Sequence, residues 1–174
     1  ESQKGFGCLG LRMHDALGNF LPESKRAVPD ILNSFEKLFN GLKTNEAKAY
    51  YRSDVGEFEI AEVDVITGAN MLILRERYLS VGGLDEAYFM YGEDIDLCYT
   101  LRRRGFKNWY YGKFSILHHK GESTVKDEIY LKRFYGAMQI FVDKYYRNKP
   151  IQRMILLSGL KLKQRLALLN LKKK

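Results

Sequence analysis

One ordered run of short motifs, residues 63–123, constrains the fold and function of this chain more than any other feature. An apolar strand pattern that contains Gly68-Ala69 comes first, and Val-Gly-Gly-Leu-Asp-Glu follows at 81–86. At the centre stands Phe-Met-Tyr-Gly-Glu-Asp-Ile-Asp-Leu (89–97), where three carboxylates fall within four positions at the predicted start of a helix. The pair His118-His119 ends a further apolar strand pattern. Strand and helix patterns therefore alternate around a cluster of acids.

The length and composition of the chain allow one domain, or most of one, with enough residues for a hydrophobic core. The 174 residues include 12 Tyr, 10 Phe and 1 Trp, which argues against disorder. Cys8 and Cys98 lie far apart and match neither a CxxC pattern nor a disulfide framework, so a reducing compartment is the default. We recognise no signal peptide and no run of about 18 apolar residues that could span a membrane.

The net charge of +8 is concentrated at the C-terminal end. Residues 151–174 hold seven of the 29 Lys and Arg and none of the 21 acids, so residues 1–150 are nearly neutral. Leucines among these cations predict an amphipathic basic helix over 151–169. Such a face is most often simply solvated, but its leucine spacing also suits an anionic membrane surface. We expect no nucleic-acid binding, because aromatic residues are not interleaved there.

Hydrophobic periodicity and turn residues predict the remaining elements. Strands are expected over 5–12, 57–66, 71–74, 108–111 and 114–118, and helices over 29–40, 75–81, 94–104 and 127–146. Irregular or turn segments are expected over 15–19, 22–26, 42–56 and 84–92. The 127–146 helix is expected to bury a stripe made of Tyr130, Phe134, Met138, Phe141 and Tyr145.

The acidic cluster Glu93, Asp94 and Asp96 has two interpretations. Asp94 could cap the helix, with Asp96 as a solvated charge in its first turn. Alternatively, the aromatic residues before the cluster desolvate a carboxylate, which raises its basicity, and a general base that acts on a hydroxyl needs this property. A calcium loop is not indicated, because the required spacing of oxygen ligands is absent.

The two histidines are also open to two interpretations. A histidine at a strand end is most often only a hydrogen-bonding residue. Imidazole is also a ligand for Mn²⁺ or Zn²⁺, and a carboxylate-rich remainder would favour Mn²⁺ or Mg²⁺. Neighbours on a strand point to opposite faces, so at most one of His118 and His119 enters a given site. Gly68-Ala69 either allows a ligand close to the backbone or only allows tight strand packing.

Taken in order, six pieces resemble the C-terminal half of a family 2 glycosyltransferase with the GT-A fold, nearest to the bacterial rhamnosyltransferase-like branch. The pieces are residues 10–13, 18–26, 63–72, 81–86, 89–97 and 118–123. The resemblance covers roughly residues 5–146. It implies an α/β fold, a mixed sheet flanked by helices, in which 1–148 form a partial GT-A domain and 149–174 a basic amphipathic tail.

The resemblance implies inverting transfer of a hexosyl or rhamnosyl group from a nucleotide-sugar donor to a glycan or lipid-linked acceptor in cell-surface polysaccharide assembly. Asp94 would then be the general base, with Glu93 beside it. Four further residues would contact substrate, namely Gly68, Ala69, Tyr91 and Asp96. His118 would bind a divalent cation, Mn²⁺ or Mg²⁺, which neutralises the charge on the leaving nucleoside diphosphate.

One departure from the family pattern matters. The N-terminal half of such enzymes ends in an Asp-x-Asp metal motif, and no Asp-x-Asp precedes Gly68 here. The chain therefore resembles a truncated enzyme, and we expect it to be inactive alone and to self-associate through exposed sheet edge and apolar surface. The family also implies work at the cytoplasmic face of the membrane, with peripheral contact through 151–174. The alternatives are a non-catalytic binding module on this scaffold or a basic nucleic-acid-binding protein.

Overall fold

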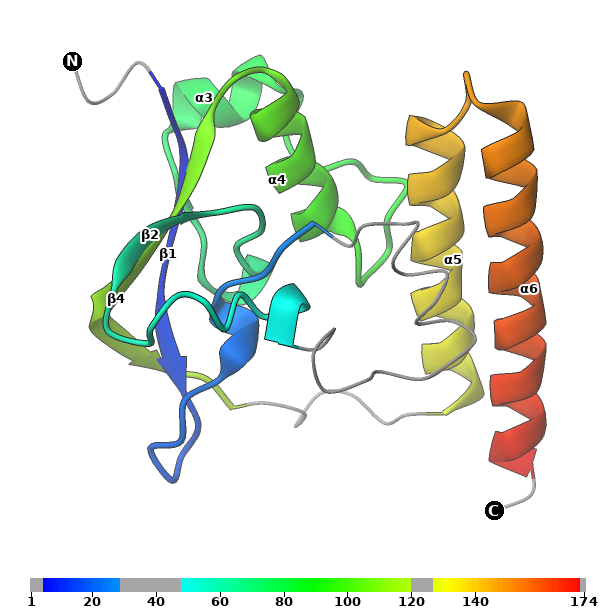
Figure 1. Ribbon diagram of the computed structural model, residues 1–174, viewed down its shortest axis with the longest axis horizontal. Helices are drawn as coiled ribbons and strands as arrows, with labels where there is room; N and C mark the ends of the chain where they lie inside the picture. The colour runs from blue at the N-terminus through cyan, green and yellow to red at the C-terminus, as the bar shows by residue number, and fades with distance from the viewer. Residues whose placement is uncertain (1–4, 29–47, 120–126, 173–174) are drawn as a thin grey trace. The chain divides into compact units, whose positions relative to one another are not determined.

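The computed structural model describes residues 5–28, 48–119 and 127–172, which form an α/β fold divided into two compact units (Figure 1). The first unit contains β1 (Phe6–His14), η1 (Pro22–Ser24), β2 (Ile60–Val63), η2 (Gly68–Asn70), β3 (Leu72–Ile73), α3 (Arg75–Ser80), β4 (Lys107–Leu117) and nearly all of α4 (Glu93–Arg103). The second unit contains residues 86–93, α5 (Glu128–Tyr145) and α6 (Pro150–Lys172).

The sheet of the first unit has four strands in the order β2-β4-β1-β3. Its two central strands, β1 and β4, run parallel, and each outer strand pairs antiparallel with its neighbour. The sheet is therefore mixed, as predicted. His14 pairs with Leu117, so the carboxyl ends of both central strands meet at one edge of the sheet.

Strand β4 corrects the prediction of two short strands over 108–111 and 114–118. It is one strand with a shift in register, because Leu11 pairs with Tyr111 whereas Arg12 pairs with Ser115. The extra residues in β4 form an irregularity of the bulge type, which bends a strand without ending it. Gly112 lies in this irregularity, and this glycine is what the sequence prediction took for a break.

Gly112 is required by the close approach of another backbone segment. A Cβ atom placed on it would lie 2.3 Å from the carbonyl oxygen of Glu57 and 2.7 Å from that of Glu59. The Tyr110 hydroxyl donates to the same Glu57 carbonyl, and burial raises the pKa of this fully buried tyrosine. The segment that leads into β2 is thus fixed against β4 by one glycine and two hydrogen bonds, the second of which runs from the Gly112 N–H to the Glu59 carbonyl at 2.8 Å.

The core of the first unit lies between the sheet and α4. Cys98 and Leu101 are fully buried, which confirms the predicted inward face of this helix. Cys98 Sγ lies 3.9 Å from Cys8 Sγ of β1, and the thiol contact together with burial raises the pKa of Cys8, so this sulfur stays protonated. Ile66 also contributes to the core, and its N–H donates to Cys98 Sγ.

Several predicted boundaries change in the structure. The pattern at 71–74 predicted a buried strand, but β3 has two residues and Leu72 is exposed, so this prediction was wrong about burial. Segment 22–26 contains a short 3-10 helix instead of a plain loop, and β2 is shorter than the predicted strand over 57–66. The predicted helix over 29–40 lies outside the described residues.

The predicted helix ends are confirmed where glycine supplies them. Gly82 and Gly83 follow α3 with φ of 91° and 71°, and Gly105 follows α4 with φ of 85°. These left-handed conformations are those that end helices and that glycine adopts without steric cost.

The second unit is built on the hairpin of α5 and α6, which lie side by side in Figure 1. Asp127 caps α5, since its side chain accepts the N–H of Tyr130. Val142 packs with Leu156 and Leu160 at the helix contact. The predicted stripe of α5 is only half-buried, because the fully buried positions of this helix are Ala137 and Val142. None of the helices in the described ranges has the length and apolar character needed to cross a membrane.

Replacing Gly112 with alanine is expected to lower the free energy of unfolding by about 2–3 kcal/mol, because the added methyl group collides with main-chain atoms that cannot rotate away. The unfolding of the first unit can be followed through Trp109, the one tryptophan of the chain. Gly5→Ala is the matched control, since a Cβ atom there meets nothing within 4 Å. Equal stability of the two variants would contradict this account of Gly112.

Candidate active site

Asp94 occupies the first turn of α4, and its residue is only 9% exposed. Its Oδ1 atom accepts the N–H of Ile95 at 2.8 Å. Hydrogen bonding to first-turn N–H groups satisfies donors that no helix carbonyl can reach. The capping interpretation of this carboxylate therefore has a physical basis in the structure, but it accounts for only one of the two oxygens.

The other oxygen of Asp94 joins two segments that are distant in the sequence. Asp94 Oδ2 accepts a hydrogen bond from Arg26 Nη2 at 2.7 Å and another from the backbone N–H of Gly68 at 3.0 Å. Arg26 is itself anchored, because its N–H and carbonyl both pair with Val65, at 3.0 and 2.9 Å. One carboxylate thus ties η2, α4 and the segment after η1 together.

The ion pair between Arg26 and Asp94 is largely removed from water, with side chains 12% and 13% exposed. Burial acts to lower the pKa of the Arg26 guanidinium, but attraction to Asp94 and contact with Tyr50 outweigh it, so this pKa is raised. Arg26 therefore stays charged. Its buried Nε has no hydrogen-bond partner among the described residues.

Arg26 is the residue of this site that sequence reasoning missed. It lies at the end of the piece 18–26, which carried part of the family resemblance, yet an arginine at the end of a polar loop gives no sign of its partner. The aromatic residues 88–91 belong to the second unit, so the predicted aromatic setting of Asp94 stays a prediction. Within the first unit, the Arg26 guanidinium and backbone N–H groups contact the Asp94 carboxylate.

Gly68 and Ala69 are exposed, so a ligand can reach this backbone. Both belong to η2, whose third residue, Asn70, donates from its side chain to the carbonyl of Leu11 at 3.0 Å. This hydrogen bond fixes η2 to β1, while Gly68 fixes it to Asp94. The predicted tight point is therefore a short 3-10 helix that is held at both of its ends.

Tyr91 and Glu93 belong to the second unit. Tyr91 has a φ of 72°, which is unusual for a bulky residue, and its ring packs edge-on against Tyr130 at 5.2 Å between centroids. Glu93 Oε2 accepts the N–H of Gly92 at 2.9 Å. Both side chains thus have local packing or capping contacts, and their roles toward a substrate stay predictions.

Asp96 is 2% exposed, so it is a buried carboxylate and not the solvated first-turn charge of the alternative interpretation. Of its two neighbours in sequence, Leu97 is buried and Ile95 is half-buried. Helical spacing alone does not separate Asp94 from Asp96, because both lie in the first turn. Direct contact of Asp96 with a substrate stays a prediction.

His118 follows the end of β4, and its N–H donates to the carbonyl of His14 at the end of β1. His118 is half-buried and His119 is exposed. Mn²⁺ and Mg²⁺ prefer sets of carboxylate oxygens. Within the described ranges, no group of three or more His, Cys, Asp or Glu could hold a metal ion. The described residues alone therefore do not complete a coordination shell for a divalent cation.

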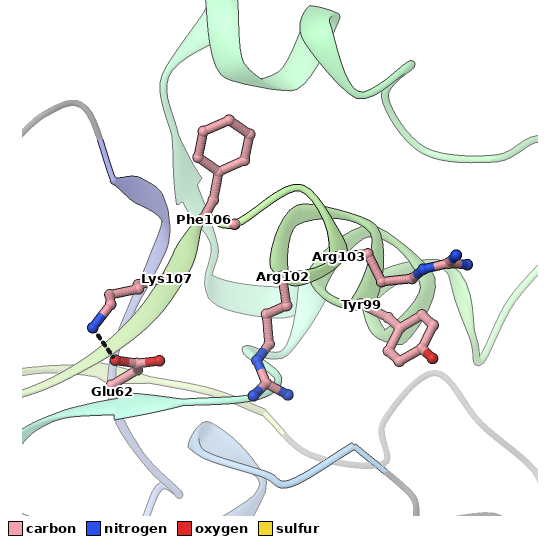
Figure 2. Close-up of a pocket in the computed structure, with 7 residues that line it drawn as sticks. Glu62, Tyr99, Arg102, Arg103, Phe106 and Lys107 are labelled. Carbon is pink, nitrogen blue, oxygen red and sulfur yellow. Dashed lines mark ion pairs between the residues drawn. The ribbon is translucent and has the colours of Figure 1, made fainter.

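A pocket of about 390 Å³ is lined by residues at the C-terminal end of α4 (Figure 2). Asp94 lies in the first turn of the same helix, at its other end. The cations of the pocket are mostly neutralised by neighbours, since Lys107 pairs with Glu62 at 2.9 Å and Arg102 pairs with Asp64 at 2.7 Å. A helix C-terminus also disfavours anions. This pocket is therefore separate from the candidate active site and does not suit a sugar nucleotide.

The chain is similar to several curated proteins. The N-acetylglucosaminyl-diphospho-decaprenol L-rhamnosyltransferase of Mycobacterium tuberculosis is 33% identical over 123 residues, which are 70% of this chain and 40% of that protein. Rhamnosyltransferase WbbL of Escherichia coli K12 is 40% identical over 57 residues, 33% of this chain and 22% of that protein. The low-salt glycan biosynthesis hexosyltransferase Agl10 of Haloferax volcanii is 28% identical over 110 residues, 59% of this chain and 36% of that protein.

These similarities are partial. The chain spans about 40% of the length of the Mycobacterium tuberculosis relatives and a smaller share of the other two. No protein-family model matches the chain. The relatives nevertheless share one named activity, because each of them is named as a rhamnosyl or hexosyl transferase.

Replacing Arg26 with methionine is expected to lower the free energy of unfolding of the first unit by about 3 kcal/mol, because the Asp94 carboxylate then stays buried without its counter-charge. In a chain that already carries Asp94→Asn, the same Arg26→Met change is expected to cost much less. Urea unfolding monitored at Trp109 measures all four members of this cycle. An equal cost in both backgrounds would show that Arg26 acts through packing and not through Asp94.

Proposed function

This chain is a rhamnosyltransferase-related sequence that covers part of its relatives, and from that premise we propose that it forms the acceptor-binding side of an inverting glycosyltransferase. The donor is a nucleotide sugar that carries a rhamnosyl or other hexosyl group. The acceptor is a hydroxyl of a glycan or lipid-linked sugar in cell-surface polysaccharide assembly. The name of the Mycobacterium tuberculosis relative, whose acceptor is N-acetylglucosaminyl-diphospho-decaprenol, supports a lipid-linked acceptor for this chain.

The convergence of three sequence motifs on Asp94 carries the proposal. Arg26 comes from the piece 18–26, Gly68 from 63–72 and Asp94 from 89–97, and the carboxylate contacts both of the other residues. A general base must be ionised and held in a fixed orientation before it accepts a proton. A guanidinium and a backbone N–H on the same oxygen hold the Asp94 carboxylate in one orientation.

The remaining hydrogen-bonding capacity of Asp94 suggests where the acceptor approaches. An ionised carboxylate has about four lone-pair positions, two on each oxygen. Arg26 and Gly68 use both positions on Oδ2, and the N–H of Ile95 uses one on Oδ1. We therefore assign the acceptor hydroxyl to the position on Oδ1 that no described residue occupies. Transfer of its proton to this oxygen leaves an alkoxide-like oxygen to attack the sugar as the nucleoside diphosphate leaves.

Gly68 has a second part in this proposal. Its backbone is exposed while its N–H is committed to Asp94, so a donor sugar held against Gly68 and Ala69 is brought toward the base. Glu93 is proposed beside the base, and Tyr91 and Asp96 are proposed on the acceptor side. Asp96 would act there from a buried position.

The divalent cation, Mn²⁺ or Mg²⁺, remains part of the proposal without a described shell. When bound, it would neutralise the leaving nucleoside diphosphate, and His118 is the residue proposed to contact it. The described residues do not complete a site around His118, so the other ligands must come from elsewhere. We also propose that the chain acts at the cytoplasmic face of the membrane and that it self-associates.

Replacing Asp94 with asparagine is expected to lower kcat by about 10²- to 10⁴-fold, the contribution of a general base, while donor binding stays intact. Nucleoside-diphosphate release from a panel of sugar nucleotides with Mn²⁺ measures this. The assay is run on this chain and on a version extended upstream by on the order of 100 residues, enough for a nucleotide-binding βαβ region.

Asp54→Asn is the control, since Asp54 is an exposed carboxylate that pairs with Arg52 and has no contact with the site. Release by the extended form alone would identify the donor and support a division of the enzyme between two halves. Full turnover by Asp94→Asn would remove Asp94 as the base. Silence from both forms, with the extended form folded and acceptor extract supplied, would favour a binding module instead.

A further inference from the structure

Helix α6 has two apolar faces, and only one of them packs against the described residues of the second unit. The inward face places Leu156 and Leu160 against Val142 of α5. Two polar contacts lie on the same side, an ion pair between Arg153 and Asp143 at 2.6 Å and a weak amide contact between the helices. The contacts that hold the hairpin together are therefore supplied by one side of α6.

The second apolar face points away from these contacts. It is a stripe of five exposed aliphatic residues, Ile151, Ile155, Leu162, Leu166 and Leu169, whose exposed fractions are 70%, 47%, 46%, 50% and 56%. At 3.6 residues per turn these positions fall within roughly 60° of arc. They extend over about 27 Å of helix, because each residue adds 1.5 Å. Scattered surface leucines need no explanation, but a continuous stripe of this length does.

Cations border this stripe on one side. Lys161 and Arg165 lie on the arc next to it, and neither forms an ion pair with another described residue. Helix α6 contains no Asp or Glu at all. Arg153, which lies on the inward side, is already neutralised by Asp143. The uncompensated positive charge therefore adjoins the exposed apolar stripe.

This charge pattern selects between two occupants of the stripe. A second copy of α6 would bring Lys161 and Arg165 near the same cations of its partner, with no acid in either helix to offset them. An anionic bilayer surface offers both complements, acyl chains for the stripe and negative headgroups for its basic border. Helices that lie in the plane of a bilayer have this arrangement, and they need not be long or apolar enough to cross it.

We propose that the stripe of α6 is a docking surface for an anionic lipid bilayer, in which the helix lies parallel to the membrane with Lys161 and Arg165 at the headgroups. The surface is built from α6 alone and does not depend on the transferase activity proposed above. Its test therefore requires no donor, acceptor or turnover. Failure of this test would remove the proposed work at the membrane face, but it would leave the proposed transferase chemistry at Asp94 standing.

The experiment is co-sedimentation of the chain with vesicles of phosphatidylcholine mixed with phosphatidylglycerol, compared with vesicles of phosphatidylcholine alone. The parent chain is expected to bind the anionic vesicles and to bind the neutral ones far less. The double variant Leu162→Gln with Leu166→Gln is expected to lose on the order of tenfold in affinity for each leucine. The double variant Lys161→Gln with Arg165→Gln is expected to lose about 25-fold.

Each double variant has a matched control. Leu79→Gln removes a leucine of similar exposure from α3, and it is expected to leave binding unchanged. Lys48→Gln with Lys113→Gln removes two exposed positive charges outside α6, so it keeps the net charge equal to that of the basic-border variant. All substituted side chains are exposed, and circular dichroism confirms that the helices of each variant remain.

Four results would overturn the proposal. The first is absence of parent binding to anionic vesicles, and the second is unchanged binding by the leucine variant, which would leave only attraction between net charges. The third is an equal loss in the Lys48 and Lys113 variant. The fourth has three parts: the parent chain is a dimer by light scattering, the leucine variant is a monomer, and the parent binds no vesicles. This result would make a second copy of the chain the occupant of the stripe.

Discussion

The buried contact of Asp94 with Arg26 and Gly68 is the interaction on which the arrangement of the candidate site depends. Removing two charges from water is costly, and the cost is recovered only when the pair has good geometry and further hydrogen bonds. Here both conditions hold, since Arg26 is fixed by its two backbone bonds to Val65 and Gly68 adds a second donor. A displacement of Arg26 or Asp94 leaves a buried charge unpaired, and a displacement of Gly68 removes the second donor, so the three segments are expected to move together or not at all.

The hydrophobic core keeps this contact in place. Helix α4 packs Cys98 and Leu101 onto the sheet, and the same helix begins at the acids of the site. Ile66 belongs to this core and lies only two residues before Gly68, so packing and the hydrogen bond to Asp94 act on one short segment. Rigid elements that carry a reactive group hold it more accurately than loops do.

The order of elements in the first unit and the position of Asp94 were predictable, because helix caps, glycine stops and apolar periodicity are local signals. Gly82, Gly83 and Gly105 end helices where they were expected to. The partner of Asp94 was not predictable, since an ion pair between residues 26 and 94 leaves no trace in local pattern. The single strand β4 was missed for a related reason. Gly112 is demanded by a backbone segment more than fifty residues away, and the sequence alone makes it resemble a turn.

Helix α6 also shows what the local sequence pattern could not predict. Its leucines and lysines predict an amphipathic helix. A helix with a single apolar face would bury that whole face against α5. The structure divides these leucines between two faces and locates the uncompensated cations beside the outer one. Two cations of the tail, Lys161 and Arg165, therefore act at one border of this stripe, and attraction of this kind decays over about 8 Å in physiological salt. Because this attraction acts only over a short distance, it favours an anionic partner that contacts the helix directly, as a bilayer does.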